Sequence, residues 1–209
     1  MYLTGWGYNN VSQQAGYLYK VNVATGAEVW SVEESGKGAF CGSPPALDCS
    51  NVYVTSYDFS TDGYLFKYSK RNGASAGSVQ IERTDATPAI DTTNGLIYVS
   101  GGWNGGDWGG STPPGVRCFY TNNLTQKWGG RVNESMGGWT CSVSLGGDGL
   151  AFVGKESGDM NSFCYNTTYA LNALTGETEW SYSQGGATAA IANDKIYTVG
   201  NNGHLYRFS

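Results

Sequence analysis

Ile97-Tyr98-Val99-Ser100 is a short apolar segment with an aromatic residue at its second position, and similar segments recur along the whole chain. The other copies are Met1-Tyr2-Leu3-Thr4, Val52-Tyr53-Val54-Thr55, Ala151-Phe152-Val153-Gly154 and Ile196-Tyr197-Thr198-Val199. Their aromatic residues are 51, 45, 54 and 45 positions apart, close to the period of about 40 to 50 residues of four-stranded propeller blades. The repeat therefore predicts an all-β propeller.

Each copy belongs to a larger unit. A small apolar segment and a turn come before it, as in Pro88-Ala89-Ile90-Asp91 followed by Asn94-Gly95. Because Asn-Gly and Asp-Gly accept the positive φ of a tight turn, the two segments are expected to pair as a hairpin. A third strand, another turn and often a Trp follow, most clearly in residues 18–30 and 169–180. The unit predicts four antiparallel strands per blade.

Two of these turns share a specific pattern. Residues 22–30 and 172–180 each have an Asn, a Thr-Gly turn and a Trp eight positions after the Asn. This pattern resembles the repeat of the pyrroloquinoline-quinone (PQQ)-type β-propellers, and the resemblance covers nearly the whole chain. It implies that Trp30, Trp128 and Trp180 dock between neighbouring blades. Gly77 stands where a further Trp is expected, which leaves the contact beside it open.

The repeats also define the expected domain. They predict one propeller domain over residues 1–209, with four to five blades visible. The expected blades are residues 39–82, 84–131 and 138–184, with partial blades at 1–34 and 186–209. The first partial blade opens on its second strand and the last stops on its third, so the two ends duplicate strands. We therefore expect the chain to belong to a larger ring, as a fragment or with a closing segment from elsewhere.

Composition excludes some classes of partner. The 12 Lys and Arg against 17 Asp and Glu leave a net charge of -5 without a basic cluster, which argues against nucleic acid. The sequence has no run of about 20 apolar residues that could span a bilayer. Its start lacks the charged and apolar regions of a signal peptide, so an export signal is expected to lie outside this sequence.

Cysteines and sequons indicate an extracellular or cell-surface glycoprotein. The five cysteines have no C-x-x-C pair, and a single His makes a zinc site improbable. Disulfides are the preferred interpretation, with Cys141 and Cys164 as the pair because both are expected on one face; small buried residues are the alternative. Four sequons, against roughly one or two by chance, predict glycosylation in loops or turns. Their acceptors are Asn10, Asn123, Asn133 and Asn166.

The sequence offers no catalytic constellation. His204, the single His, is expected to be structural, and no Ser-His-Asp or Cys-His set can be assembled. The family's quinone-dependent dehydrogenases hold their cofactor against an adjacent cysteine pair and a calcium ion, with a catalytic Asp nearby. No two cysteines here are adjacent, which argues against quinone binding in this segment. We therefore expect a protein that is not an enzyme and has no cofactor.

Loops between second and third strands are the expected binding region. The loop at 103–114 carries Trp103 and Trp108, and Trp139 is expected on the same face. These side chains are candidates for stacking on sugars or a partner surface; packing down over a neighbouring blade is the alternative. Four loop acids leave room for weak Ca²⁺ binding, although their spacing matches no EF-hand. They are Asp58, Asp62, Asp107 and Asp159.

Together these observations predict a non-catalytic extracellular β-propeller. It would act as a binding or scaffolding module with a protein or glycan ligand on its loop face, and it could self-assemble as a subunit of a cell-surface layer or filament. The alternative is a segment of a PQQ-dependent dehydrogenase-like enzyme.

Overall fold

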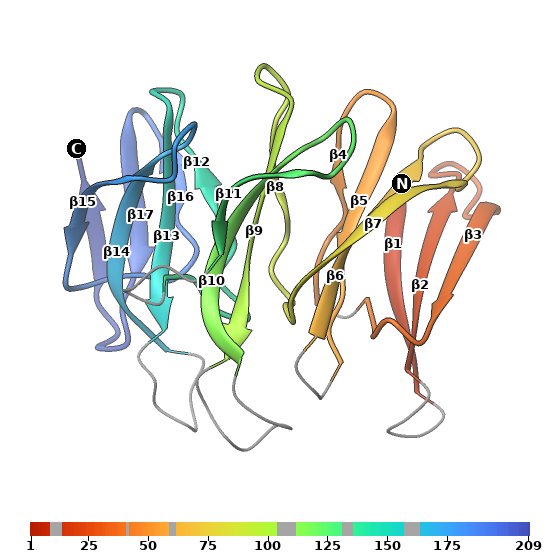
Figure 1. Cartoon of the computed structure of the whole chain (residues 1–209), viewed down its shortest axis with the longest axis horizontal. Helices are drawn as coiled ribbons and strands as arrows, with labels where there is room; N and C mark the ends of the chain where they lie inside the picture. Colours follow the sequence, from red (N-terminus) through yellow and green to blue (C-terminus); the bar gives the residue numbers. More distant parts are fainter. Residues whose placement is uncertain (9–13, 41, 59–61, 104–111, 131–135, 157–163) are drawn as a thin grey trace.

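The computed structural model of the chain describes residues 1–8, 14–40, 42–58, 62–103, 112–130, 136–156 and 164–209. Within these ranges it has eighteen β-strands and no helix, and so no helix that is long and apolar enough to cross a membrane. The strands form five antiparallel sheets that stand side by side (Figure 1). The prediction of an all-β propeller with four-stranded blades is confirmed.

The first and last sheets have three strands and the three between them have four. The first contains β1 (Tyr2–Tyr8), β2 (Gln14–Val21) and β3 (Glu28–Ser35). The second contains β4 (Ala46–Leu47), β5 (Asn51–Thr55), β6 (Asp62–Ser69) and β7 (Ser75–Glu82). The third contains β8 (Ala89–Asp91), β9 (Leu96–Trp103), β10 (Thr112–Tyr120) and β11 (Gln126–Gly130). The fourth contains β12 (Ser144–Leu145), β13 (Leu150–Glu156), β14 (Tyr165–Asn172) and β15 (Thr178–Tyr182). The fifth contains β16 (Ala190–Ala192), β17 (Lys195–Val199) and β18 (Leu205–Phe208).

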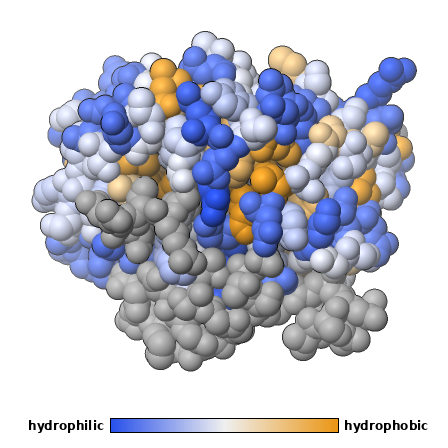
Figure 2. Space-filling model, in the orientation of Figure 1, coloured by the Kyte–Doolittle hydropathy of each residue, from blue (hydrophilic) through white to orange (hydrophobic). Residues whose placement is uncertain are grey.

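The sheets pack face to face around the repeated aromatic residues. Tyr53 and Tyr98, the central aromatics of β5 and β9, are both 0% exposed. Tyr98 lies in one core cluster with Val153 and Leu171 of the next sheet. Burying an apolar side chain of this size stabilises the fold by about 2 kcal/mol. Apolar side chains are visible in Figure 2 only as small patches between hydrophilic ones, as expected when the apolar faces lie between the sheets.

Hydroxyls of the repeated tyrosines connect each blade to the next one. Tyr2 Oη donates to the carbonyl of Lys70 at 3.5 Å, and Tyr53 Oη donates to that of Thr121 at 3.2 Å. The corresponding bond from Tyr98 to Ala173 is 3.1 Å long. The three carbonyls occupy the same place, just after the third strand of the following blade. The repeated aromatic therefore fills the core and also provides a hydrogen bond to a carbonyl in the next turn.

Tryptophans dock on the turns of neighbouring blades, as the resemblance implies. Gly73 leaves room for Trp30, because a Cβ at Gly73 would lie 2.9 Å from Trp30 Cε3. Gly176 does the same for Trp128, with 2.6 Å to Cδ2, and Trp128 Nε1 donates to the Ala173 carbonyl at 3.0 Å. Both glycines have positive φ, 73° and 78°, so the turn and the docking site each require glycine.

The junction beside Gly77 uses the opposite arrangement. Gly77 pairs with Lys67 at the position where the other blades pair a Trp with the third strand. The following turn has Leu124 where the other turns have Gly, and Leu124 keeps the positive φ of 58°. Leu124 is only 5% exposed, and a Cβ at Gly77 would lie 3.7 Å from its Cδ1. The bulky apolar group thus comes from the turn instead of from the strand.

Candidate functional site

The structure brings together two of the three tryptophans proposed for the loop face. Trp103, at the end of β9, and Trp139, in the segment between β11 and β12, have ring centroids 6.0 Å apart. Tyr57 packs edge-on against Trp139 at 5.0 Å. Trp103 and Trp139 are 2% and 4% exposed, which favours the alternative that they pack down between blades. Trp108 lies outside the described residues, and binding by these tryptophans remains a prediction.

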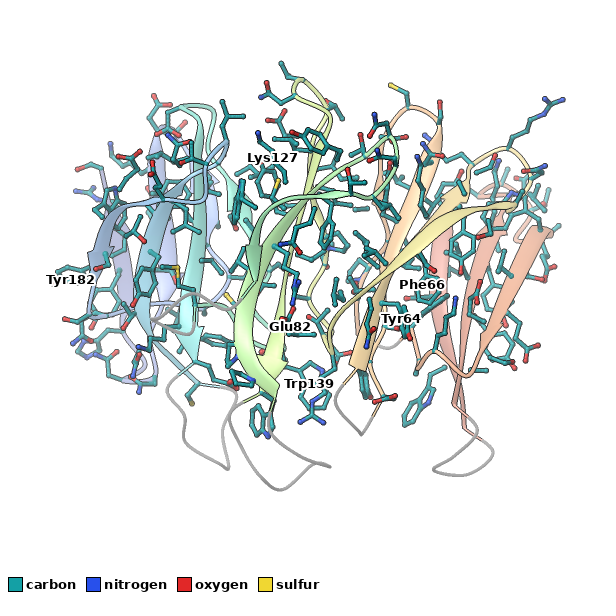
Figure 3. All side chains as sticks on the ribbon, in the orientation of Figure 1. Tyr64, Phe66, Glu82, Lys127, Trp139 and Tyr182 are labelled. Atoms are coloured by element: carbon teal, nitrogen blue, oxygen red, sulfur yellow. The ribbon has the colours of Figure 1, made fainter. Side chains whose placement is uncertain are left out.

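This cluster lies where several loops begin. Tyr57 follows β5, Trp103 ends β9 and Glu156 ends β13, so each stands at or next to the start of a connection between second and third strands. Figure 3 shows Trp139 at the lower end of the sheets, on the side of these connections. We call Tyr57, Arg83, Trp103, Trp139 and Glu156 the loop-base cluster. The loop-base cluster thus lies where three adjacent connections begin.

A buried guanidinium is the charged centre of the loop-base cluster. Arg83 is 0% exposed, and its guanidinium carbon lies 4.8 Å from the ring centroid of Trp139. This is the geometry of a cation–π contact, which gains strength when it is desolvated. Burial lowers the pKa of Arg83, while the carboxylates of Asp58 and Glu156 oppose that shift. Two acids and one indole therefore hold a single cation at the loop bases.

Backbone hydrogen bonds fix the segment that carries Trp139. Its carbonyl accepts from the backbone N–H of Asp85 at 2.9 Å and from Thr84 Oγ1 at 3.0 Å. One residue earlier, the N–H of Gly138 donates to Ser100 Oγ at 3.0 Å. The first two bonds connect the segment between blades two and three with the segment between blades three and four, and the third connects the latter segment with β9. The position of the indole is thus set by neighbouring blades and not by its own loop alone.

Asp85 has an unusual environment beside this segment. Burial raises the pKa of its carboxyl to about 7, and an interaction with the side chain of Trp139 opposes the shift. The carboxyl therefore titrates near neutral pH. Such a group suits proton exchange as well as a structural role.

We expect Asp85 to make the fold less stable as pH rises from about 4 to about 7. An unfolded Asp ionises near pH 3.9, whereas the folded carboxyl stays protonated until about pH 7, so the folded state binds the extra proton in this window. Asp85→Asn should gain about 2 kcal/mol over the wild type between pH 4 and pH 8. Urea unfolding at both pH values checks this, and an equal difference at the two values would contradict it.

Cys141 and Cys164 both have free thiols, so the structure does not contain the expected disulfide. Cys141 is buried, its Sγ donates to the Gly186 carbonyl at 3.4 Å and it accepts the Gly154 N–H at 3.3 Å. Burial raises its pKa to about 11. The thiol is therefore protonated and already satisfied, which matches the alternative of a small buried residue. Cys49 and Cys118 are free as well, and Cys41 lies outside the described residues.

The sequons occupy different environments. Asn123 lies in the exposed turn before β11, where its Oδ1 accepts from Thr125 Oγ1 at 2.8 Å. Asn166 is half-buried in β14, so the expectation that every sequon lies in a loop or turn is wrong for this residue. Asn10 and Asn133 fall outside the described residues. Glycosylation remains a prediction, and Asn123 is the accessible acceptor among the two that are described.

The loop acids form no recognisable metal site in the described part of the chain. No three His, Cys, Asp or Glu side chains gather there in a way that could hold an ion. Asp58 is half-buried near Arg83, Asp62 begins β6, and Asp107 and Asp159 lie outside the described residues. The proximity of Arg83 makes Asp58 a poor calcium ligand. Weak Ca²⁺ binding remains a prediction.

Comparison with known proteins identifies the fold. No protein-family model matches the sequence, and no curated protein has a significantly similar sequence. A europium-containing methanol dehydrogenase superposes with a TM-score of 0.65 and 10% identity, over 94% of this chain and 47% of that one. A quinohemoprotein alcohol dehydrogenase from Pseudomonas putida HK5 gives 0.66 and 14%, over 94% and 38%. The fold is that of the PQQ-type β-propellers.

The likeness is not confined to dehydrogenases. The computationally designed Ika8 protein superposes with a TM-score of 0.63 and 10% identity over 97% of this chain and 57% of that one. At these identities the likeness shows the fold alone. The chain spans between 38% and 57% of the length of these three proteins.

The described residues do not fit the quinone site that the resemblance implies. That site needs adjacent cysteines, and the nearest two here, Cys41 and Cys49, are eight positions apart. Cys141, the cysteine nearest in sequence to the loop-base cluster, is buried and hydrogen bonded to backbone. The face of Trp139 carries the Arg83 guanidinium. The residues that the structure describes therefore give no basis for a step through the quinone.

Proposed function

We propose that the chain is a non-catalytic binding and scaffolding propeller that acts outside the cell or at its surface. One observation carries the proposal: the loop-base cluster ties the starts of adjacent loops to one buried cation and three aromatic rings. Binding residues are commonly displayed on loops that a rigid scaffold positions. A rigid base lowers the cost of ordering those loops when a ligand binds.

The ligand proposed for this face is a protein or a glycan. Trp139→Phe tests the role of the loop-base cluster, because it shrinks the indole on which Arg83 rests while keeping an aromatic ring. We expect about a tenfold loss of binding on an oligosaccharide or cell-surface protein array, with faster hydrogen exchange at Trp103 and Glu156. Trp128→Phe is the matched control, since Trp128 docks at a blade junction on the turn Gly176, and binding should be unchanged.

The competing function is a segment of a quinone-dependent dehydrogenase. Titration of the chain with pyrroloquinoline quinone and Ca²⁺ should give no saturable change in quinone absorbance if the proposal is right. A saturable spectrum that Trp139→Phe abolishes would replace the proposal with the enzyme.

Location is tested separately by the mass of the natively produced protein, before and after deglycosylation. Excess mass that deglycosylation removes, assigned to Asn123 by peptide mapping, supports an extracellular protein. A chain without such modification would contradict it.

A further inference from the structure

Three turns of the described structure contain the dipeptide Asn-Gly, in which the asparagine side chain is least shielded from reaction with its own backbone. In this reaction the backbone nitrogen of the Gly attacks the side-chain Cγ of the Asn, and a Gly has no Cβ to obstruct the approach. The pairs are Asn72–Gly73 between β6 and β7, Asn94–Gly95 between β8 and β9, and Asn202–Gly203 between β17 and β18. All three asparagines are exposed, and the glycines have positive φ values of 73°, 63° and 76°. Exposure and backbone conformation therefore do not distinguish the three pairs.

The backbone N–H of the glycine does distinguish them. Gly73 N–H donates to the Ser69 carbonyl at 2.9 Å, and Gly203 N–H donates to the Gly200 carbonyl at 2.9 Å. Among the described residues, Gly95 N–H has no hydrogen-bond acceptor. A nitrogen that already donates must break its bond before it can lose the proton and attack, which slows the reaction about fivefold. Gly95 N is therefore the nucleophile that can react without losing a bond.

The side-chain oxygens show the same difference. Asn72 Oδ1 accepts the Ala74 N–H at 3.2 Å, and Asn202 Oδ1 accepts the His204 N–H at 3.1 Å. Both bonds fix the amide group on the backbone that follows. Among the described residues no donor reaches Asn94 Oδ1, whose amide bonds only through Nδ2. The Cγ of Asn94 can therefore turn toward its nucleophile without releasing its oxygen.

Asp91 lies beside the group that has to leave. Asn94 Nδ2 donates to Asp91 Oδ2 at 2.6 Å, and this bond holds the pKa of Asp91 below its usual value. The carboxyl is therefore ionised at neutral pH. Its other oxygen accepts the Thr93 N–H at 2.9 Å, which fixes its position. A fixed carboxylate stabilises the positive charge that develops on Nδ2 when this nitrogen takes up a proton and departs.

We propose that Asn94–Gly95 is a modification site at which the chain deamidates itself with the assistance of Asp91. Gly95 N forms a bond to Asn94 Cγ, the proton of Gly95 N passes through solvent to Nδ2, and the Cγ–Nδ2 bond breaks with loss of ammonia. Water then opens the cyclic imide on one side to aspartate or on the other to isoaspartate. Asn94 lies on the wall of a cavity of about 420 Å³ between the turns of the third and fourth sheets, so water has access. This inference is independent of the proposed binding function.

The product changes the turn. A carboxylate at position 94 removes the bond from Nδ2 to Asp91 and places two like charges in contact, which is unfavourable. Isoaspartate also lengthens the backbone of the turn by one carbon. We expect about fivefold faster hydrogen exchange at the amides of Thr93 and Asn94, which both donate to Asp91 Oδ1. Asn94→Asp provides the reference for the charged form.

The test follows the three asparagines in one sample of the full chain. Cleavage after Lys and Arg places them in separate peptides, residues 72–83, 84–117 and 196–207. Fragmentation of the second peptide separates Asn94 from Asn104, which lies outside the described residues. In the folded chain at mildly alkaline pH, Asn94 should deamidate at least about fivefold faster than Asn72 or Asn202.

The chain unfolded in urea is the matched control. All three asparagines should react there at similar rates, because the hydrogen bonds that distinguish them are lost. Equal rates in the folded chain would overturn the proposal. The same order of rates in urea would also overturn it, because the sequence around each pair and not the turn would then set the rate.

Asp91→Asn tests the role of the carboxylate. This variant keeps an oxygen for the Thr93 N–H and removes the charge, so deamidation of Asn94 should slow about fivefold. The rates at Asn72 and Asn202 should stay the same. An unchanged or faster rate at Asn94 would overturn the assistance by Asp91. In Asn94→Gln the longer side chain closes a larger and less favourable ring, so product at position 94 of this variant would contradict the mechanism.

Discussion

Gly154→Ala lowers the free energy of unfolding by about 3 kcal/mol or more, the largest effect we expect from a single methyl group in this protein. A Cβ at Gly154 would collide with the backbone carbonyl of Gly186, whose carbon would lie at 2.5 Å and whose Cα at 2.8 Å. Backbone cannot rotate away as a side chain can. The segment between the fourth and fifth sheets would have to move off β13, and the Cys141 thiol bonds to both glycines would break with it.

Urea unfolding of Gly154→Ala beside Gly147→Ala measures this effect. Gly147 has no atom within 4 Å of its Cβ position and no φ in the left-handed region, so its variant should change stability by less than about 0.5 kcal/mol. Equal midpoints for the two variants would show that β13 and the Gly186 segment are not in close contact.

Leu124→Ala costs about 3 kcal/mol, because it empties the junction where Gly77 provides no side chain. Leu124→Gly should cost about 1 kcal/mol less than Leu124→Ala, since the φ of 58° is strained for alanine and not for glycine. This order is the reverse of the usual one. The reason is that Leu124 keeps the left-handed backbone of the glycine turns, while its side chain fills the place of a docking Trp.

Thermal and urea unfolding of the two variants test the order, with Leu174→Ala as control. Leu174 lies in the equivalent turn of the fourth blade and is 47% exposed, so truncating it should change little. If Leu124→Gly is the less stable of the two, the left-handed geometry at this turn is wrong. If both variants are as stable as the wild type, Leu124 does not fill the junction.

The sequence predicted the architecture because the blade pattern is local. The aromatic at the centre of each second strand and the Asn with its Thr-Gly turn are contained in short segments, and their spacing determines the blade. The exchange at Gly77 and Leu124 could not be predicted, because it couples two positions 47 residues apart in different blades. A Leu in a turn position otherwise held by glycine was nevertheless a signal that the sequence contained.

The candidate site was predictable only in part. Trp103 and Trp139 were correctly placed on one side of the propeller, but their burial depends on Tyr57 and Arg83, which come from other blades. Arg83 and Asp85 lie between β7 and β8, in a segment whose sequence is typical of an ordinary polar connection. Burial of a charged side chain is decided by what packs over it, and the sequence of the segment does not contain that information.

The bonds from tyrosine hydroxyls to the next turn give the propeller a direction. Each of the first three blades donates this bond to the turn of the blade that follows, so neighbouring blades are coupled in pairs. Phe152 has the ring of its tyrosine counterparts and no hydroxyl, so this polar clamp stops before the fifth sheet. The junction between the fourth and fifth sheets therefore lacks the tyrosine hydrogen bond, and its polar contacts come from other residues, such as Ser144 Oγ, which donates to the Ala189 carbonyl at 2.6 Å.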